Sequence, residues 1–136
     1  MTKTPNEIRA GKASRKNIAS ENKFVDRLKR RGFTAYTTGK AVGIPDIVAW
    51  KNKKLQFFEI KPGFGKGSSG ALLKKTQEKW IKNYCIKTGV KVTLVYYKGS
   101  RPFKYHEILL NLKNISKYTY GTKIDILEET KKMSYR

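Results

Sequence analysis

The sequence predicts one α/β domain in which a mixed β-sheet is flanked by helices. Its 136 residues suit a single domain, and a hydrophobic content of 38% is enough to form a core. The apolar pattern also changes along the chain, from helical spacing to short strand-like runs and back. The expected order is therefore helix, three strands, helix, and then one or two strands, without an internal repeat.

The amino-terminal third is expected to hold an arm and then the first helix. Residues 1–13 are polar and aperiodic, which predicts a flexible basic arm ahead of a core domain at 14–110. Ile18, Val25 and Leu28 then recur at helical spacing, and Gly32 supplies a stop, so a helix is expected over 14–31. The tail 111–136 has no clear pattern and is interpreted as a carboxy-terminal extension of the same domain.

Short apolar runs predict the strands. Residues 33–38 are rich in aromatic and β-branched types, and the runs 47–50 and 55–61 are joined by a polar turn, so this pair is expected to form a hairpin. The continuous apolar run 90–97 is typical of a strand inside a sheet, and 103–109 is a further candidate. Between them, the glycine-rich loop 63–70 leads into a helix expected from about 71 to 88.

The charge indicates a polyanionic partner. Lys and Arg number 31 against 10 acidic residues, a formal net charge of +21, which favours phosphate contacts and counterion release. We interpret nucleic acid as the partner, with an anionic membrane surface or simple solubility as alternatives, because no amphipathic helix with a wide apolar face accompanies the charge. No apolar stretch approaches the roughly 20 residues that span a bilayer, and no leader is apparent, so we expect a cytoplasmic protein, or one of the host cytoplasm if it is viral.

Several residue types offer little chemistry. The lone Cys85 excludes an internal disulfide and a multi-cysteine zinc site, and it is expected in the core. His106 is the only histidine, so a surface or packing role is preferred. Trp50, Trp80 and the tyrosines could stack on bases, but at strand and helix positions most are expected in the core.

Asp46, Glu59 and Lys61 form the constellation that carries chemistry. Side chains alternate along a strand, so Glu59 and Lys61 share one face while Ile60 points into the core on the other. In the expected hairpin, Asp46 at the start of one strand lies near the end of its partner. Two carboxylates and an amine therefore converge.

Carboxylate oxygens at one place are hard ligands of the kind that Mg²⁺ prefers, with Mn²⁺ as a substitute. Asp46 and Glu59 would hold the metal, the main-chain carbonyl of Ile60 could be a further ligand, and Lys61 would orient or deprotonate the attacking water. The alternative is that E-x-K triplets are common in a Lys-rich chain. That alternative is weakened because Phe58 and Ile60 mark a buried strand, where charges need a partner.

Glu21 provides an independent indication from the first helix. It precedes Phe24 by three residues and Val25 by four, which places it on the stripe that faces the core. A buried salt bridge, for example with Arg15, is an equally good explanation for Glu21 alone.

Together Glu21, Pro45-Asp46 and Glu59-Ile60-Lys61 resemble the pattern of the PD-(D/E)xK nuclease superfamily, and most of all archaeal-type Holliday junction resolvases. The resemblance covers roughly residues 14–97. It implies a restriction-endonuclease-like core in αβββαβ order, Mg²⁺-dependent hydrolysis of DNA phosphodiester bonds, and a homodimer that cuts four-way junctions. It also implies that Glu21 completes the metal shell through water. The resolvases' active-site serine has no clear counterpart, although Thr37 or Thr38 could replace it.

Candidate nucleic-acid contacts surround these segments. They are basic residues in or beside the site segments, with one glutamine at a position that borders such sites in the superfamily: Arg15, Lys16, Lys40, Lys66, Lys74, Lys75 and Gln77. The loop GFGKGSSG does not match the phosphate loop of nucleotide hydrolases, so no nucleotide cofactor is expected. Two rival functions stay open: a related nuclease acting on flaps, ends or single strands, and a non-catalytic nucleic-acid-binding protein.

Overall fold

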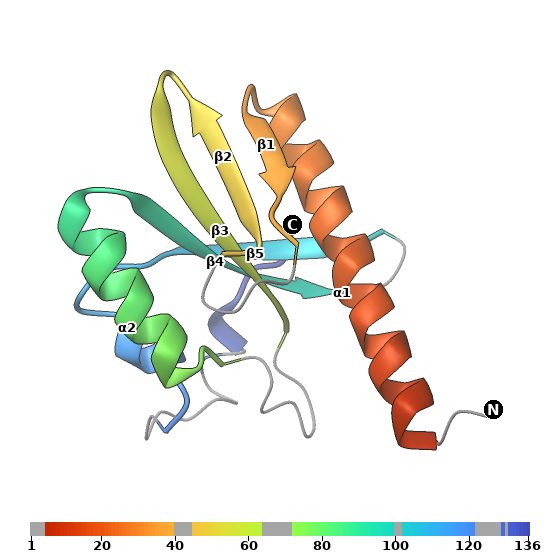
Figure 1. Ribbon diagram of the computed structural model, residues 1–136. Coiled ribbons are helices and arrows are strands. Elements are labelled where there is room, and N and C mark those ends of the chain that lie inside the picture. The colour runs from red at the N-terminus through yellow and green to blue at the C-terminus, as the bar shows by residue number, and fades with distance from the viewer. Residues whose placement is uncertain (1–4, 40–44, 64–71, 100–101, 122–128, 130) are drawn as a thin grey trace.

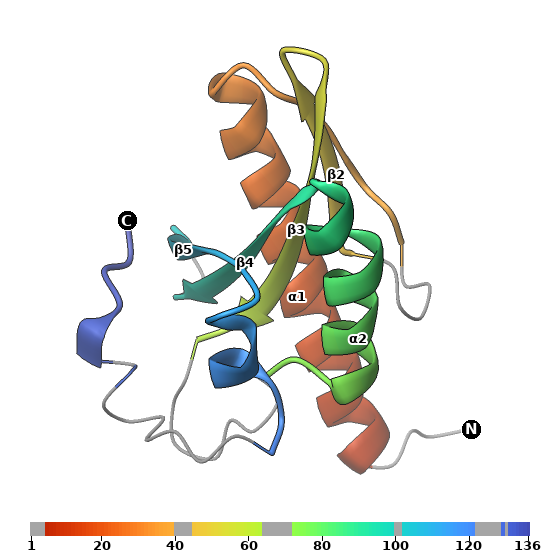
Figure 2. The ribbon, with the colours of Figure 1, turned by 90° about the vertical axis from the view of Figure 1, so that its left-hand side faces the viewer.

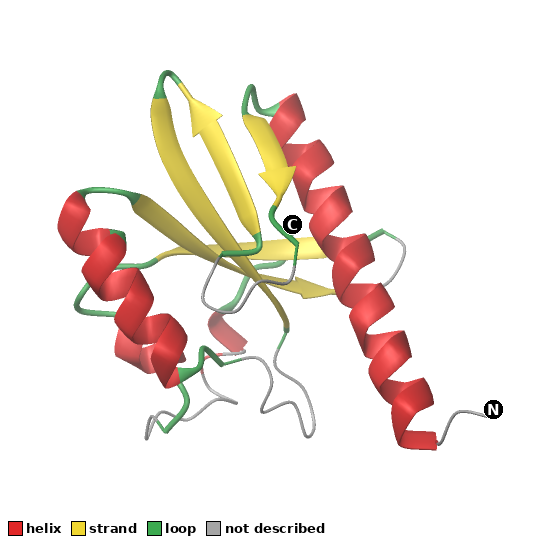
Figure 3. Cartoon of the chain, viewed as in Figure 1, coloured by secondary structure: helices red, strands yellow, loops and turns green. Residues whose placement is uncertain are grey.

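A computed structural model shows a five-stranded mixed sheet with helices on both faces (Figures 1 and 3). It describes residues 5–39, 45–63, 72–99, 102–121, 129 and 131–136, with side chains described from residue 17 onward. The elements in chain order are α1 (Pro5–Arg30), β1 (Thr34–Thr37), β2 (Ile47–Lys51), β3 (Lys54–Pro62), α2 (Lys75–Tyr84), η2 (Ile86–Thr88), β4 (Lys91–Lys98), β5 (Lys104–Leu109) and η3 (Ile115–Tyr118). The predicted α/β class and αβββαβ order are confirmed, and β5 adds an edge strand.

Helix α1 is longer than the sequence predicted. It begins at Pro5, so residues 5–13 are helical rather than part of an aperiodic arm. Residues 5–13 lack regularly spaced apolar side chains, which means that they have no stripe to pack against a core. A segment without such a stripe can still form a helix. Proline suits the first helical position, and the alanine, lysine and arginine residues that follow are good helix formers. Figure 1 shows this first part of α1 running on past the sheet.

The predicted hairpin is formed by β2 and β3. These strands pair antiparallel, with Ile47 opposite Phe58 and Lys51 opposite Lys54. The turn residues Asn52 and Lys53 both have positive φ, as a two-residue hairpin loop with the right twist requires. Strand β1 pairs antiparallel with β2, β4 lies parallel to β3, and β5 closes the sheet antiparallel to β4.

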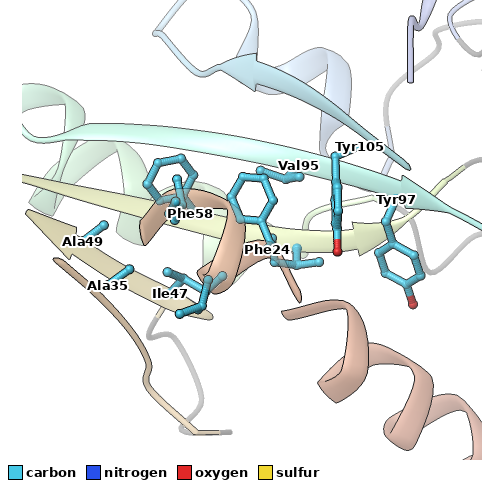
Figure 4. Close-up of a cluster of buried hydrophobic side chains, with 11 residues drawn as sticks. Phe24, Ala35, Ile47, Ala49, Phe58, Val95, Tyr97 and Tyr105 are labelled. Atoms are coloured by element: carbon cyan, nitrogen blue, oxygen red, sulfur yellow. The ribbon is translucent and has the colours of Figure 1, made fainter. Parts of the chain in front are cut away.

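One core lies between α1 and the sheet (Figure 4). It is built from apolar and aromatic residues of α1 and all five strands: Phe24, Val25, Leu28, Ala35, Ile47, Ala49, Phe58, Ile60, Val95, Tyr97 and Tyr105. Within it the Phe24 ring packs 5.5 Å from Phe58 and 5.0 Å from Tyr105, centroid to centroid. Ile60 therefore points into this core, as strand alternation predicted.

A second core lies on the opposite face, between the sheet, α2 and η3 (Figure 2). It contains Cys85, Leu94 and Tyr96, so the expected core position of Cys85 is confirmed. Burial raises the pKa of the Cys85 thiol to about 11, which keeps it protonated and unreactive at neutral pH.

Helix α2 is shorter than predicted. Leu72 and Leu73 are buried but precede the helix. Leu73 instead forms an isolated parallel bridge with Thr119, in which its main chain donates to Tyr118 and accepts from Tyr120. Lys74 is extended and caps the helix, so α2 starts only at Lys75. Among the described helices, none combines the length and apolar character needed to cross a bilayer.

The described carboxy-terminal end returns to the edge of the sheet. The main chains of Arg136 and Tyr105 exchange two hydrogen bonds, at 2.8 and 2.9 Å. This contact ties the extension to β5, whose other edge pairs with β4. Tyr135 then reaches the end of β3, where its hydroxyl lies 2.7 Å from the position that a Cβ atom on Gly63 would take.

This close approach predicts a stability effect. Gly63→Ala is expected to destabilise the fold by about 1–3 kcal/mol, because the new methyl group would displace the Tyr135 ring and press on the main-chain oxygen of Tyr97. Urea unfolding measures the change, and Tyr135→Phe provides the matched partner because it removes only the nearer oxygen. In the double variant the loss should shrink; a fully additive loss would show that Tyr135 does not pack against Gly63.

Candidate active site

The sheet brings Asp46 and Glu59 together. Because Ile47 is opposite Phe58, the register sets Asp46, one residue earlier, opposite Glu59, one residue later. Both then lie on the α2 face of the sheet, where β2 begins and β3 nears its end. Asp46 Oδ2 accepts a hydrogen bond from the main-chain N–H of Ile60 at 2.7 Å, which fixes its carboxylate against β3.

Glu59 is a buried acid beside a second acid. Its exposed fraction is only 5%. Burial raises the pKa of Glu59 well above its ordinary value; the charge of Asp46 and a side-chain hydrogen bond with Asp46 raise it further, while Lys61 opposes the shift. Without a cation, therefore, the protonated form of Glu59 is favoured.

Gln77 on α2 connects the remaining groups. Its Nε2 donates to Glu59 Oε1 at 3.4 Å, and its Oε1 accepts from Lys61 Nζ, also at 3.4 Å. The same oxygen accepts from the main-chain N–H of Lys74 at 2.9 Å, which caps α2. The sequence suggested Gln77 as a nucleic-acid contact at a position bordering the site. In the structure Gln77 lies inside the constellation and orients both ends of the E-x-K triplet.

Glu21 lies within electrostatic reach of this group. It is half-buried on α1, and its charge contributes to the raised pKa values of both Glu59 and Tyr97. For Glu59 this is the smallest of the contributions, after those of burial, Asp46 and Lys61. Asp46, Glu59 and Lys61 are placed together by β2 and β3, and Glu21 acts on them from α1 through its charge.

Thr38 provides a support that the sequence did not reveal in this role. Its hydroxyl lies within hydrogen-bonding distance of the main-chain oxygens of Pro45 and Asp46, and its main-chain N–H donates to Asp46 O at 3.0 Å. Thr38 thus holds the main chain just before β2, where Asp46 lies. This contact gives Thr38 a positioning role, and its suggested replacement of the resolvases' serine stays a prediction.

The donor set fits a hard divalent cation. Two carboxylates, one of them buried, face each other, and a cation would stabilise both charges in place of the proton. Among the described residues no three His, Cys, Asp or Glu side chains converge as a ligand group. Mg²⁺ is commonly bound by one or two protein carboxylates, and its remaining coordination positions are filled by water and substrate phosphate. Asp46 and Glu59 would supply the two carboxylates, and a main-chain oxygen could fill a further position.

The candidate nucleic-acid contacts are only partly placed. Lys74 and Lys75 are exposed at the start of α2, beside Gln77. Arg15 and Lys16 lie on the described backbone of α1, but their side chains lie outside the described residues, as do Lys40 and Lys66 altogether.

The raised pKa of Glu59 predicts how stability depends on pH in the absence of metal. The folded state holds this proton more tightly than the unfolded chain, whose Glu pKa is about 4.3. This stabilisation is complete below that value and is lost as the pH rises through the raised pKa of folded Glu59. Thermal unfolding in EDTA should therefore show a Tm that falls with rising pH, and Glu59→Gln should flatten that part of the profile.

Glu107→Gln is the matched control, because Glu107 is a partly exposed acid paired with Arg31 at 3.0 Å. It should retain the wild-type slope. Equal slopes of Tm against pH in wild type and Glu59→Gln would contradict the raised pKa of Glu59. Added Mg²⁺ should raise the Tm of wild type at the upper end of the pH range, because the ion binds only the folded state.

Comparisons with known proteins give one kind of match. No protein-family model matches the chain, and no curated protein matches it. Among solved structures, the chain is similar to the Holliday junction resolvase of the archaeal hyperthermophile Archaeoglobus fulgidus, with 13% sequence identity and a TM-score of 0.47. The similarity covers 81% of this chain and 96% of the resolvase.

Proposed function

We propose that this protein is a metal-dependent endonuclease of the PD-(D/E)xK type that hydrolyses DNA phosphodiester bonds. The observation that carries the proposal is the convergence of Asp46, Glu59, Lys61 and Gln77 at one end of the β2–β3 hairpin. A solubility role does not explain it, since Glu59 is buried and its neighbours are held by specific hydrogen bonds. The net charge of +21 supports a nucleic-acid substrate.

Each residue has a defined part in the proposed reaction. Asp46 and Glu59 would hold Mg²⁺, or Mn²⁺ in its place, with the Ile60 carbonyl as a further candidate ligand and Glu21 acting through water. The bound ion lowers the pKa of water and neutralises charge on the phosphoryl group. Lys61 would orient or deprotonate the attacking water and stabilise the charge that develops on phosphorus. Gln77 keeps the Lys61 amine and the Glu59 carboxylate in place.

A four-way DNA junction is the substrate that the sequence resemblance favours. In this proposal the protein acts as a homodimer, because two opposed strands must be cut to resolve a junction symmetrically. Lys74 and Lys75 lie at the start of α2 beside Gln77, where they can contact phosphates next to the scissile bond.

The test is a panel of end-labelled substrates of shared sequence: a four-way junction, a linear duplex, a flap and a single strand, each with Mg²⁺ and with EDTA. Paired, opposed nicks in the junction by a dimer would support the whole proposal. Cleavage mainly of the other substrates would retain the nuclease and overturn the junction preference. Binding of all four without cleavage would overturn the enzyme and favour a non-catalytic nucleic-acid-binding protein.

A further inference from the structure

An exposed aromatic surface lies on the same face of the sheet as the candidate active site. Tyr36 is 60% exposed and Trp50 41% exposed, and their rings meet edge to face at 6.2 Å. Their neighbours Ala35 and Ala49 are buried in the core with α1, so both aromatic rings point to the opposite, α2 side. From its strand position Trp50 was among the residues expected mostly in the core. Its side chain instead points away from the core with α1 and is partly exposed.

The register connects this surface to the carboxylate pair. Tyr36 is opposite Val48, and Val48 is opposite Phe57, which forms a row across the sheet two residues from Asp46 and Glu59. Trp50 and Leu55 form the next row. At about 3.3 Å per residue, these rows lie about 7 and 13 Å from the carboxylates along the strands.

Helix α2 lies beside this surface and packs on β3. The ring of Trp80 packs 5.8 Å from Phe57 and 6.3 Å from Tyr84, which is itself 67% exposed. In Figure 1 α2 lies toward the β4 side of the sheet, while β1 and the end of the β2–β3 hairpin extend away from it. The aromatic surface, defined as Tyr36, Val48, Trp50 and Leu55, therefore lies two to four residues along the strands from the Asp46–Glu59 pair.

From this placement we infer that the aromatic surface binds unpaired nucleotides of the DNA strand next to the scissile phosphate, with bases stacking on Tyr36 and Trp50. The inference rests on the proposed nuclease function and adds a substrate class to it, namely DNA with single-stranded character beside the cut. Aromatic rings stack on any base, and the exposed Lys53 in the turn of the β2–β3 hairpin can contact phosphates.

A second copy of this chain is a poorer occupant. An aromatic side chain presents about 150–250 Å² when fully exposed, so Tyr36 and Trp50 at their exposures offer about 200 Å² together. A stable interface buries about 800 Å² on each partner. A DNA strand, in contrast, complements the net charge of +21.

The experiment is a binding titration in EDTA, which separates stacking from cleavage. Fluorescently labelled DNA is used as a blunt duplex and as the same duplex with a single-stranded extension of about five nucleotides. The variants are Tyr36→Leu and Trp50→Leu, with Trp50→Phe as the conservative replacement. Tyr120→Leu is the matched control, since Tyr120 is also 60% exposed but follows η3.

Each leucine variant should weaken binding of the extended DNA by about 5- to 100-fold and change blunt-duplex binding by less than about twofold. Trp50→Phe should restore most of the affinity, and Tyr120→Leu should bind as wild type. Equal losses on both DNAs, or no loss on either, would overturn the inference. So would sedimentation showing that the leucine variants change a dimer into a monomer, because the surface would then be a contact between copies.

The outcomes also separate this inference from the proposed function. If the leucine variants lose affinity for the extended DNA but wild type cleaves nothing in Mg²⁺, the stacking surface stands and the nuclease fails. If wild type cleaves and the leucine variants bind as wild type, the nuclease stands and the surface has no part in substrate binding.

Discussion

Replacing Glu59 by glutamine is expected to lower the rate of Mg²⁺-dependent DNA cleavage by at least about 10³-fold. The change keeps the size of the side chain but removes one of the two carboxylates, and loss of metal-derived stabilisation costs several kcal/mol in the transition state. Glutamine can still accept from Gln77, so the local packing should persist. Single-turnover cleavage of an end-labelled substrate measures the rate.

The controls for Glu59→Gln separate chemistry from folding and binding. Its urea midpoint should be no lower than that of wild type, because an acid that is costly to ionise has been replaced. Its affinity for DNA in EDTA should change little. Glu107→Gln, which alters an acid on β5, should cleave as wild type. A Glu59→Gln variant that is well folded and cleaves at the wild-type rate would remove Glu59 from the site.

Replacing Lys61 by methionine is expected to lower cleavage by about 10²- to 10⁴-fold, the range associated with a positioned proton-transfer or charge-stabilising group. Methionine preserves the apolar stem, so the effect should lie in the rate of the chemical step. Because Glu59 and Asp46 remain, metal binding should persist, and excess Mg²⁺ should not rescue the rate.

Lys54→Met is the matched control for Lys61→Met. Lys54 is an exposed lysine at the start of the same strand, so this variant loses the same charge from the protein as a whole. Equal losses of activity in the two variants would assign the effect to general electrostatic attraction of DNA. A loss confined to Lys61→Met places the effect at the site.

The sequence predicted how Asp46, Glu59 and Lys61 are placed relative to one another, because short-range rules govern their positions. Alternation within β3 set Glu59 and Lys61 on one face and Ile60 on the other, and the polar turn after Lys51 fixed the hairpin that brings Asp46 opposite Glu59. These relations depend on residues close in the chain. The core position of Cys85 followed as simply from its residue type.

The remaining features depend on contacts between distant segments. Gln77 joins the site because α2 lies between two parallel strands, β3 and β4, which brings its start back to the end of β3. Thr38, which follows β1, supports Asp46, which precedes β2. Trp50 has the residue type of a core position, yet its side chain lies on the side of β2 opposite the α1 core and is 41% exposed. The start of α1 was placed too late because apolar periodicity detects packing, and a helix can extend beyond the part that packs.

The measurement that tests the metal site most directly is localised backbone cleavage by Fe²⁺ in the presence of ascorbate and bound DNA. Fe²⁺ that replaces Mg²⁺ produces hydroxyl radicals, which cut the polypeptide next to the ion. Cuts beside Asp46 and between Glu59 and Lys61, suppressed by excess Mg²⁺ and absent in Glu59→Gln, are expected if these carboxylates hold the metal. Cuts at other positions, or the same cuts in Glu59→Gln, would contradict a metal site formed by Asp46 and Glu59.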